Sequence, residues 1–297
     1  ISNFTTADVN GLQEHEGCDG FFCDARGWVL EMAILLRSDE GLRIRVARGR
    51  GHGLATHLDR YHIREDLTIF QNREELHSVL VSGGQTKKWL GEFFDVSVPV
   101  NVYQQIQEHG GDNPFSTRSN PARLMAVDWV SSQGFLVTVP EECKDVLQSS
   151  LLESGLQEST DEMITYLRLQ QGWPLGNDIP EKTLPQEVGL NARTISLTKG
   201  CYLGQETVAR LDALGHVNRR LVVLAVEKGG SMVVGDSVAS NDGVVSRVTS
   251  VGCLGNQEVS LAMAIIPLKS MQQKSNLTVA GKAANVVSPV LLDTLVT

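Results

Sequence analysis

Residues 199–210 read KGCYLGQETVAR and place several kinds of reactive side chain in one short segment. They include a thiol, an ammonium, an amide, a carboxylate and a guanidinium, carried by Cys201, Lys199, Gln205, Glu206 and Arg210. The two glycines of the segment permit backbone conformations that are closed to other residues, so a turn is expected here. If the chain is extended at its start, Lys199 and Cys201 project on the same face, and an ammonium beside a sulfur favours the thiolate. The segment therefore predicts a reactive or metal-competent thiol.

A structural interpretation of the same residues stays open. A cysteine is often a small buried hydrophobe, and a lysine is often a solvated surface charge. Gln205 and Glu206 can hold a loop through backbone amides as readily as they can contact a ligand. Tyr202 is more typical of a packing anchor than of a catalyst, and Arg210 is expected to pair with a nearby carboxylate.

The composition of the 297 residues limits the classes of function. A hydrophobic content of 41% indicates a globular protein, and the length suits two to three domains. The formal net charge of -9 argues against a broad nucleic-acid footprint or an anionic membrane surface, although a local basic cleft stays open. No stretch approaches the roughly 18 apolar residues of a membrane span, and no signal-peptide pattern opens the chain. We expect a cytoplasmic protein without nucleic-acid or membrane partners.

The five cysteines are spread over the chain and form no C-x-x-C pair. An odd number with wide spacing favours reduced thiols over a disulfide framework. It also argues against a resident four-thiolate cluster or a structural zinc, because those ligands normally come in close pairs. Any iron–sulfur role is therefore expected to be transient or indirect.

Hydrophobic patterning predicts an α+β fold built on antiparallel sheets. A capping box of Ser159 and Glu162 marks the start of one helix. Short alternating apolar runs after residue 217 predict a small antiparallel β-barrel. We expect an α+β core of two subdomains over residues 1–216 and the barrel over residues 217–297. The predicted helices cover 53–61, 86–94, 141–153 and 161–171, and the predicted strands cover 42–47, 67–70, 76–81, 124–130, 135–139, 221–226, 244–251, 259–265 and 277–280, with a polar separator at 107–120.

The run KGCYLGQE resembles the K-G-C-Y-x-G-Q-E signature of the folate-binding YgfZ/GcvT-like family, which is related to the glycine cleavage T-protein. The resemblance is to the branch that supports iron–sulfur enzyme maturation. Residues 3–9 resemble the family's T-N-D-V segment, and residues 23–30 resemble its D-x-K/R-G-R hairpin. Further matches to the segment before the signature are Arg168, Gly172, Pro174, Gly176, Pro185 and Glu187. The likeness covers nearly the whole chain, and it implies that such proteins carry a further strand and helix before the position of Ile1.

The resemblance implies a ring of three domains around a central channel that holds tetrahydrofolate, with the signature loop at its rim. The pterin edge of folate suits a carboxylate or an amide, and its glutamate tail suits Arg or Lys. By matching position, Arg168 is expected at the tail or the channel wall; the alternative is a cation at a helix C-terminus. The folate-binding candidates are Arg168, Glu31, Gln205, Glu206, Tyr202 and Arg210.

Two departures from the aminomethyltransferases bear on the chemistry. Their G-G-I-L-D-D-L stretch, which carries a pair of carboxylates, corresponds to residues 27–33, where Glu31 is the one remaining carboxylate. Their G-Y-T-G-E-D-G segment is absent, and residues 131–134 stand in its place. We therefore expect a tetrahydrofolate-binding accessory protein for iron–sulfur enzyme assembly or repair, with Cys201 as functional thiol, Lys199 tuning it, and client or assembly proteins as partners. The alternatives are a one-carbon transferase that uses Glu31 as its acid, and a folate-sensing scaffold in which Cys201 is buried.

Overall fold

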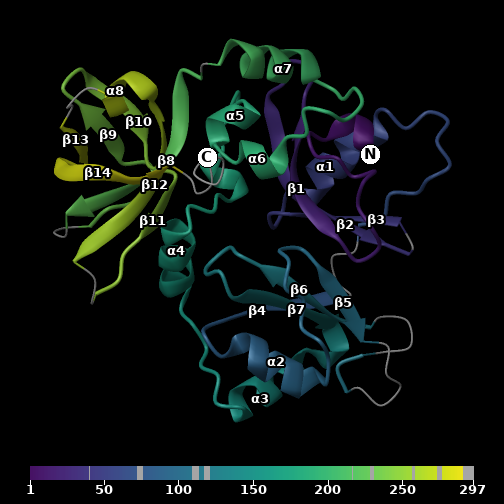
Figure 1. The fold of residues 1–297 in the computed structure, drawn as a ribbon. Helices are drawn as coiled ribbons and strands as arrows, with labels where there is room; N and C mark the ends of the chain where they lie inside the picture. The colour runs from purple at the N-terminus through teal and green to yellow at the C-terminus, as the bar shows by residue number, and fades with distance from the viewer. Residues whose placement is uncertain are drawn as a thin grey trace.

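The computed structural model describes residues 1–39, 41–71, 76–108, 114–116, 121–215, 217–227, 231–255, 258–272 and 276–289. Helices and strands are mixed, and the strands form three antiparallel sheets. Figure 1 shows three lobes, one around each sheet, that meet near the middle of the molecule. The expected mixture of helices with antiparallel sheets is confirmed, while the ring with its channel stays a prediction.

The first lobe contains a three-stranded sheet in the order β1-β2-β3. Its strands are β1 (Gly17–Cys23), β2 (Val29–Ser38) and β3 (Gly41–Val46), preceded by the short helix η1 (Ser2–Phe4) and followed by α1 (Gly51–Asp59). Successive side chains of a strand point to opposite faces. Phe22 therefore packs with Leu54 and Leu58 of α1, whereas Asp19 and Phe21 point to the other face, toward the middle of the molecule.

The second lobe contains a four-stranded sheet in the order β4-β7-β6-β5. Its elements are β4 (Leu76–Ser82), α2 (Thr86–Phe94), β5 (Gln105–Glu108), β6 (Ala122–Val127), β7 (Gly134–Pro140), η2 (Glu141–Cys143) and α3 (Lys144–Glu153). Leu90 of α2 and Leu147 of α3 pack on one face of the sheet. The strands predicted at 124–130 and 135–139 and both predicted helices of this region are confirmed, within a few residues at their ends.

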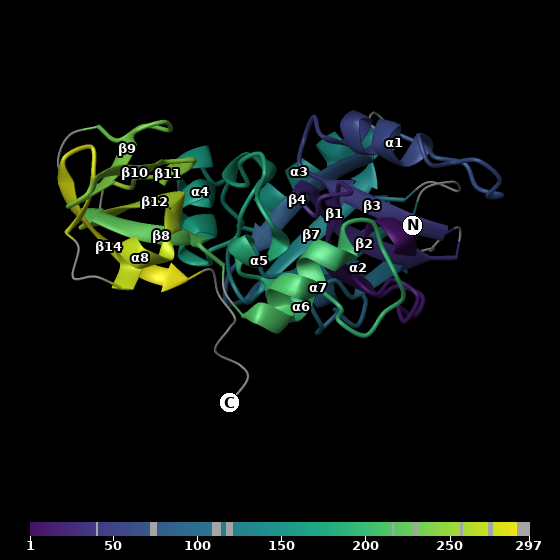
Figure 2. The same ribbon diagram turned by 90° about the horizontal axis from the view of Figure 1, so that it is seen from above.

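The third lobe contains a seven-stranded sheet in the order β10-β9-β13-β14-β8-β12-β11. Its elements are β8 (Arg219–Glu227), β9 (Ser237–Ser240), β10 (Gly243–Arg247), β11 (Ser250–Gly252), β12 (Val259–Pro267), α8 (Leu268–Gln272), β13 (Leu277–Val279) and β14 (Lys282–Pro289). Figure 2 shows this sheet to one side of the other two lobes. The single strand predicted at 244–251 is in fact two strands, β10 and β11, with different partners. Closure of the sheet into a barrel stays a prediction, as does the boundary at residue 217.

The segment between the second and third sheets supplies short helices that connect the lobes. They are α4 (Asp161–Gln170), η3 (Gly176–Asp178), α5 (Pro185–Val188), α6 (Asn191–Thr194) and α7 (Gln205–Leu214). The helix predicted at 161–171 is confirmed. Its capping residue is Thr160, whose hydroxyl accepts the Met163 amide at 3.2 Å, and not Ser159 as the sequence pattern suggested.

One predicted strand is wrong. Residues 67–70 form no strand, and the side chains of Leu67 and Phe70 are 38% and 78% exposed. Ile69 packs against the core of the first lobe, but no strand of the described residues pairs with this loop, and a short apolar run predicts a strand only where a partner strand is in reach. The predicted polar separator at 107–120 lies largely outside the described residues.

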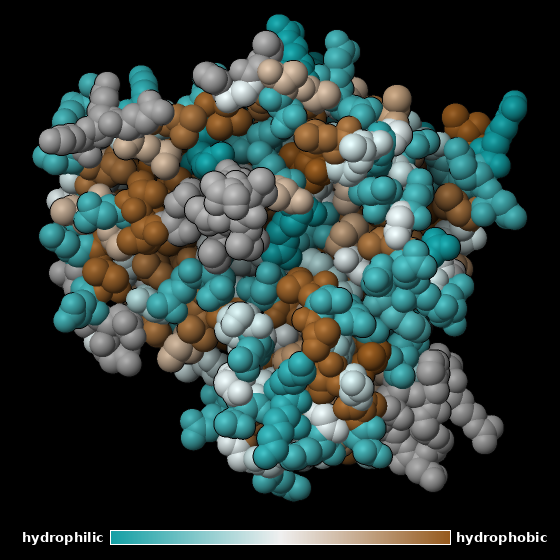
Figure 3. Space-filling model, in the orientation of Figure 1, coloured by the Kyte–Doolittle hydropathy of each residue, from teal (hydrophilic) through white to brown (hydrophobic). Residues whose placement is uncertain are grey.

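A shared hydrophobic core joins the three lobes. It contains Phe21 from the first sheet, Leu136 from the second and Met263 from the third. Figure 3 shows hydrophilic and hydrophobic side chains interspersed over the outer face of the molecule. Of the helices in the described ranges, none is long and apolar enough to cross a membrane.

Candidate functional site

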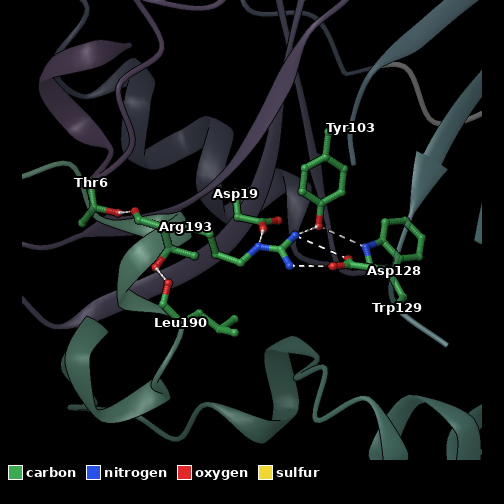
Figure 4. A network of polar contacts seen from close by, with 8 residues as sticks. Thr6, Asp19, Tyr103, Asp128, Trp129, Leu190 and Arg193 are labelled. Atoms are coloured by element: carbon green, nitrogen blue, oxygen red, sulfur yellow. Dashed lines mark hydrogen bonds and ion pairs between the residues drawn. The ribbon is translucent and has the colours of Figure 1, made fainter. Parts of the chain in front are cut away.

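Arg193 of α6 links the first two lobes through a buried set of polar contacts (Figure 4). Its Nε lies 2.5 Å from Asp19 Oδ2, and its Nη1 donates to Asp128 Oδ2 at 2.7 Å. Its Nη2 donates to the Tyr103 hydroxyl at 3.0 Å. One guanidinium therefore binds two carboxylates, from β1 and from the turn after β6. Together with Trp129 and Trp173, these residues are called the Arg193 network below.

Two aromatic rings lie against this guanidinium, and a third ring contacts both of them. It lies 5.4 Å from the Tyr103 ring centroid and 5.2 Å from the Trp173 ring centroid, within the range of cation–π attraction. Trp129 donates its indole N–H to the Tyr103 hydroxyl at 3.2 Å and stacks on Trp173, with ring centroids 6.2 Å apart. Residues from four separate segments thus form one aromatic and charged site.

The backbone of α6 is fixed from the N-terminal segment. The Thr6 hydroxyl donates to the Thr194 carbonyl at 2.6 Å, and the Thr194 hydroxyl donates to the Leu190 carbonyl at 2.7 Å. Thr6 also accepts the Phe21 amide at 2.9 Å, which ties the same contact to β1. These bonds set the position of Arg193 opposite Asp19.

Asp19 is an unusual carboxyl, because its residue is 1% exposed. Burial raises its pKa to about 6, and the Arg193 charge acts in the opposite direction. No hydrogen bond of ordinary geometry reaches its Oδ1 atom among the described residues, but the Tyr103 hydroxyl lies near enough to lower the pKa of the carboxyl as a hydrogen-bond donor. Buried polar atoms are normally paired, so this oxygen is a candidate acceptor for a ligand.

Tyr103 shows two features expected of a residue held for function. Its φ of 62° lies in the left-handed region, which a bulky residue adopts at a cost of about 1–3 kcal/mol. Burial and the neighbouring Asp19 raise the pKa of its hydroxyl well above the ordinary value. The hydroxyl therefore keeps its proton at neutral pH.

The raised pKa of Asp19 predicts a pH effect on stability. The folded-state pKa of about 6 lies above the ordinary value of 3.8, so the folded protein binds the extra proton between these values. Stability from this group is present at low pH and is lost as the pH rises through about 6. The loss amounts to at most roughly 3 kcal/mol, since one pKa unit corresponds to about 1.4 kcal/mol.

Urea unfolding of the wild type and of Asp19→Asn at pH 5 and pH 7 measures this effect. The drop in the free energy of unfolding from pH 5 to pH 7 should be larger in the wild type than in the variant. Equal drops in the two proteins would contradict the assignment.

Lys199 of the signature segment acts as a clamp on the N-terminal segment. Its ammonium donates to the carbonyls of Ser2, Thr5 and Ala7 at 2.5, 2.8 and 2.9 Å. Burial lowers its pKa, and the thiol that its charge influences is Cys18, whose pKa burial raises to about 12. Cys201 is exposed, and no hydrogen bond joins it to Lys199 in the described residues. The tuning of Cys201 by Lys199 stays a prediction without support from these contacts.

Replacing Lys199 by Met should loosen the N-terminal segment. The change removes three charge-assisted hydrogen bonds, for which we expect a loss of about 2–3 kcal/mol of stability. Limited proteolysis should cut the variant near residues 2–7 faster than the wild type. Lys88→Met serves as control, because Lys88 is exposed on α2, where its ammonium lies 3.9 Å from the exposed Glu92. Unchanged cleavage in Lys199→Met would refute the clamp.

The remaining residues of the signature divide into buried and exposed positions. Tyr202 is buried. Its burial raises the pKa of its hydroxyl to about 12, and the nearby Cys23 makes a smaller contribution in the same direction. Gln205 accepts the Tyr202 amide at 3.3 Å, so it holds the loop from within. Glu206 and Arg210 are exposed on α7, and the carboxylate partner expected for Arg210 is not found in the described residues. The structure brings neither of these two close to the Arg193 network.

Arg168, expected at the folate tail or the channel wall, is held by protein partners, and its role toward a ligand stays a prediction. It is buried, and its Nη1 donates to the Trp173 carbonyl at 2.6 Å and to Asp178 at 2.8 Å. Its Nη2 donates to the Ser250 hydroxyl at 2.8 Å. The guanidinium is therefore occupied in joining α4 to η3 and β11.

Glu31 also lies apart from the Arg193 network. It stands opposite Phe22, whose side chain packs toward α1, on the sheet face away from Asp19. Its Oε2 accepts Arg50 Nε at 2.6 Å, and burial raises its pKa while Arg50 lowers it. Its Oε1 has no hydrogen-bond partner among the described residues.

The sequence pattern did not single out the members of the Arg193 network. Asp19 carried one signal, a lone carboxylate in the apolar run GCDGFFC that forms a buried strand. Charged residues are rarely fully buried unless they are paired. The other members lie in loops and in a four-residue helix, where no local pattern marks them.

A surface hollow of about 870 Å³ lies in the second lobe, between α2 and the β6–β7 turn. Val98 and Phe135 line its apolar part, and Lys87 and Lys88 line its rim. No member of the Arg193 network lines it. Because it holds no buried side chain without a partner among those described, it is a weaker candidate than the Arg193 network.

Comparison with known proteins gives distant relatives, and no family model matches the chain. It is 26% identical over 221 residues to "tRNA-modifying protein YgfZ" from Colwellia psychrerythraea and 27% identical over 226 residues to that from Escherichia coli. Both matches cover 74% of this chain but 63% and 64% of the relatives, which is under two thirds of their length. "Putative transferase At1g60990, chloroplastic" from Arabidopsis thaliana is 24% identical and aligns with 98% of this chain and 66% of its own.

A solved structure shows the same fold. The glycine cleavage system aminomethyltransferase T from Bartonella henselae superposes with a TM-score of 0.80 at 19% identity. The match covers 98% of this chain and 80% of the aminomethyltransferase. At this identity the likeness concerns the fold alone.

Proposed function

Since the chain belongs to the YgfZ/GcvT-like family, we propose that it is a tetrahydrofolate-binding accessory protein that supports the assembly or repair of iron–sulfur enzymes. Because relatives are named as tRNA-modifying, we propose that its client proteins include enzymes that modify tRNA. Cys201 is the proposed functional thiol. The family likeness and the chemistry of the Arg193 network are what support this proposal.

The residues of the Arg193 network fit a pterin ring. The pterin edge presents N–H donors, and the Asp19 carboxylate is a buried acceptor whose Oδ1 receives no hydrogen bond of ordinary geometry among the described residues. Trp129 and Trp173 offer flat apolar surface in the same network. The buried Asp19 carboxylate, held by a guanidinium that also lies on the Trp173 ring, is the single observation that carries the assignment.

Each residue then has a defined task in holding tetrahydrofolate. Asp19 would accept from the pterin, Trp129 would stack on it, and Arg193 would keep the Asp19 carboxylate in place. When it is bound, tetrahydrofolate would itself act as the carrier of one-carbon units. The exposed position of Cys201 leaves its thiol open to a client protein.

The transferase alternative lacks a supporting contact. It needs an acid group at the folate nitrogens, and Glu31 was the residue proposed for it. Glu31 is paired with Arg50 on the sheet face away from Asp19, so it does not share a site with the Arg193 network.

Anaerobic calorimetric titration with tetrahydrofolate tests the proposal. The wild type should show saturable binding, and Cys201→Ala should bind with unchanged affinity. Asp19→Asn should bind about 10–100-fold more weakly, because a charge-assisted hydrogen bond contributes about 1.5–3 kcal/mol. Asp66→Asn, at an exposed site, is the matched control.

The outcomes separate the parts of the proposal. Absence of binding in the wild type would refute the folate site. Equal affinity in folded Asp19→Asn would place the ligand elsewhere. Retained activity of an iron–sulfur client enzyme in cells that carry Cys201→Ala would remove the thiol from the mechanism.

A further inference from the structure

The turn between β1 and β2 carries a tryptophan with two cations beside its ring. The Arg26 guanidinium lies 5.0 Å and the Lys182 ammonium 5.6 Å from the centroid of Trp28. Both distances fall within the range of cation–π attraction. Arg26 and Lys182 are exposed and Trp28 is partly exposed. These three residues are called the Trp28 platform below.

The fold holds this platform rigidly from the side of the turn. Asp24 accepts the amides of Arg26 and Trp28 on one carboxylate oxygen, at 2.9 and 3.0 Å. The turn also packs directly on the signature loop, because a side chain on Gly204 would meet the Asp24 carbonyl at 2.5 Å. The platform is therefore adjacent to the loop that carries the exposed Cys201.

Lys182 is held in place by a second, independent arrangement. Its φ of 61° lies in the left-handed region, which is unfavourable for lysine. Its carbonyl accepts Arg219 Nη2 at 2.7 Å, and Arg219 is paired with Glu187 at 2.8 Å. A strained backbone that the surroundings maintain is a mark of a functional position.

Within the described ranges, the two cations of the platform are not consumed by ion pairs. In the described part of the chain, neither Arg26 nor Lys182 forms an ion pair with an acid. The nearest acids in sequence are Glu181, which precedes Lys182, and Asp24, whose carboxylate accepts the Arg26 and Trp28 amides; neither forms an ion pair with the two cations among the described residues. The result is an aromatic ring with two cations beside it that are free of ion pairs to any described acid, on a protein of net charge -9.

We propose that the Trp28 platform binds a segment of single-stranded RNA. Arg26 and Lys182 would contact its phosphates, and a base would stack on the indole or on the guanidinium plane. An acidic peptide would use the two charges but would have no need of the indole, so the tryptophan favours RNA. The site would bring RNA next to Cys201. This proposal does not depend on folate binding.

Fluorescence anisotropy with a short labelled oligouridine and the full chain tests the proposal. The double variant Arg26→Gln, Lys182→Gln should bind at least about tenfold more weakly. The slope of log K against the logarithm of the salt concentration should also become shallower by about 1.4. The variant loses two phosphate contacts, and each contact on a single strand contributes about 0.7 to this slope. Trp28→Leu should weaken binding about 5–100-fold, as expected for the loss of one stacked base, and Trp28→Phe should keep most of the affinity.

Control variants make the outcome decisive. Arg48→Gln and Arg64→Gln change exposed arginines elsewhere and should leave the affinity within about twofold. Thermal unfolding confirms that each variant is folded. The proposal is overturned if the wild type shows no saturable binding of the oligouridine, or if the control variants lose as much affinity as the platform variants. A poly-glutamate peptide is also tested as a competitor of the oligouridine. If it competes equally well in the wild type and in Trp28→Leu, the platform is an acidic-peptide site and the RNA proposal is overturned.

Discussion

Replacing Arg193 by Met should lower the free energy of unfolding by about 3–5 kcal/mol, the usual cost of breaking a buried ion pair by removing one partner. The variant would leave Asp19 without a counterion in a site where its side chain is 0% exposed. It would also remove the link to Asp128 and to the Tyr103 hydroxyl, so two lobes would lose a direct contact. Equilibrium unfolding in urea measures the loss.

The control for this prediction is Arg210→Met, which removes an exposed guanidinium from α7. We expect a change within about 0.5 kcal/mol for it. Arg193→Lys should recover part of the stability, because it restores a charge without the geometry to bind both carboxylates. If Arg193→Met were as stable as the control, the Arg193 network would not join the lobes. In that case the buried Asp19 carboxylate would lose its value as evidence for a ligand.

Replacing Gly204 by Ala should destabilise the protein by about 3 kcal/mol or more, because the added carbon has no space and the backbone is left-handed. The φ of Gly204 is 81°. A Cβ there would approach the Asp24 carbonyl oxygen at 2.5 Å and the Gly27 backbone at 2.7 and 2.8 Å. All three contacts are with backbone atoms, which cannot rotate away. The variant should unfold at a clearly lower temperature, and its signature loop should separate from the β1–β2 turn.

Gly200→Ala is the matched control within the same loop. Gly200 is exposed, its φ is not positive, and an added Cβ would meet no atom within 4 Å. Its effect should stay within about 1 kcal/mol. Similar melting temperatures for the two variants would show that the loop does not pack on the turn as described. The Trp28 platform would then lose its link to Cys201.

The local elements were largely predictable from the sequence. The helix expected at 86–94 is α2, and the strand expected at 76–81 is β4, with one more residue. Periodicity and turn residues act within a few positions of one another, so a short window of sequence contains the information. The strand expected at 67–70 failed because an apolar run does not show whether a partner strand is present.

The candidate site was much less predictable. The sequence drew attention to the thiol and charges of residues 199–210, and the structure leaves Cys201 exposed and turns Lys199 toward the N-terminal segment. Arg168, expected at a ligand, is occupied by Asp178 and Ser250. A residue type shows what a side chain can do, but its partners decide what it does.

Family likeness, composition and the order of helices and strands were determined by the sequence itself, since each depends on residue identity or on local spacing. The tertiary structure alone decided which charges meet. Lys199 reaches carbonyls 192–197 positions away, and Arg193 meets Asp128 across 65 positions. Periodicity indicates which face of an element is buried, but it does not identify the element that covers that face. Pairing of distant side chains follows from the packing of three sheets around one shared core, and that packing is a property of the whole chain.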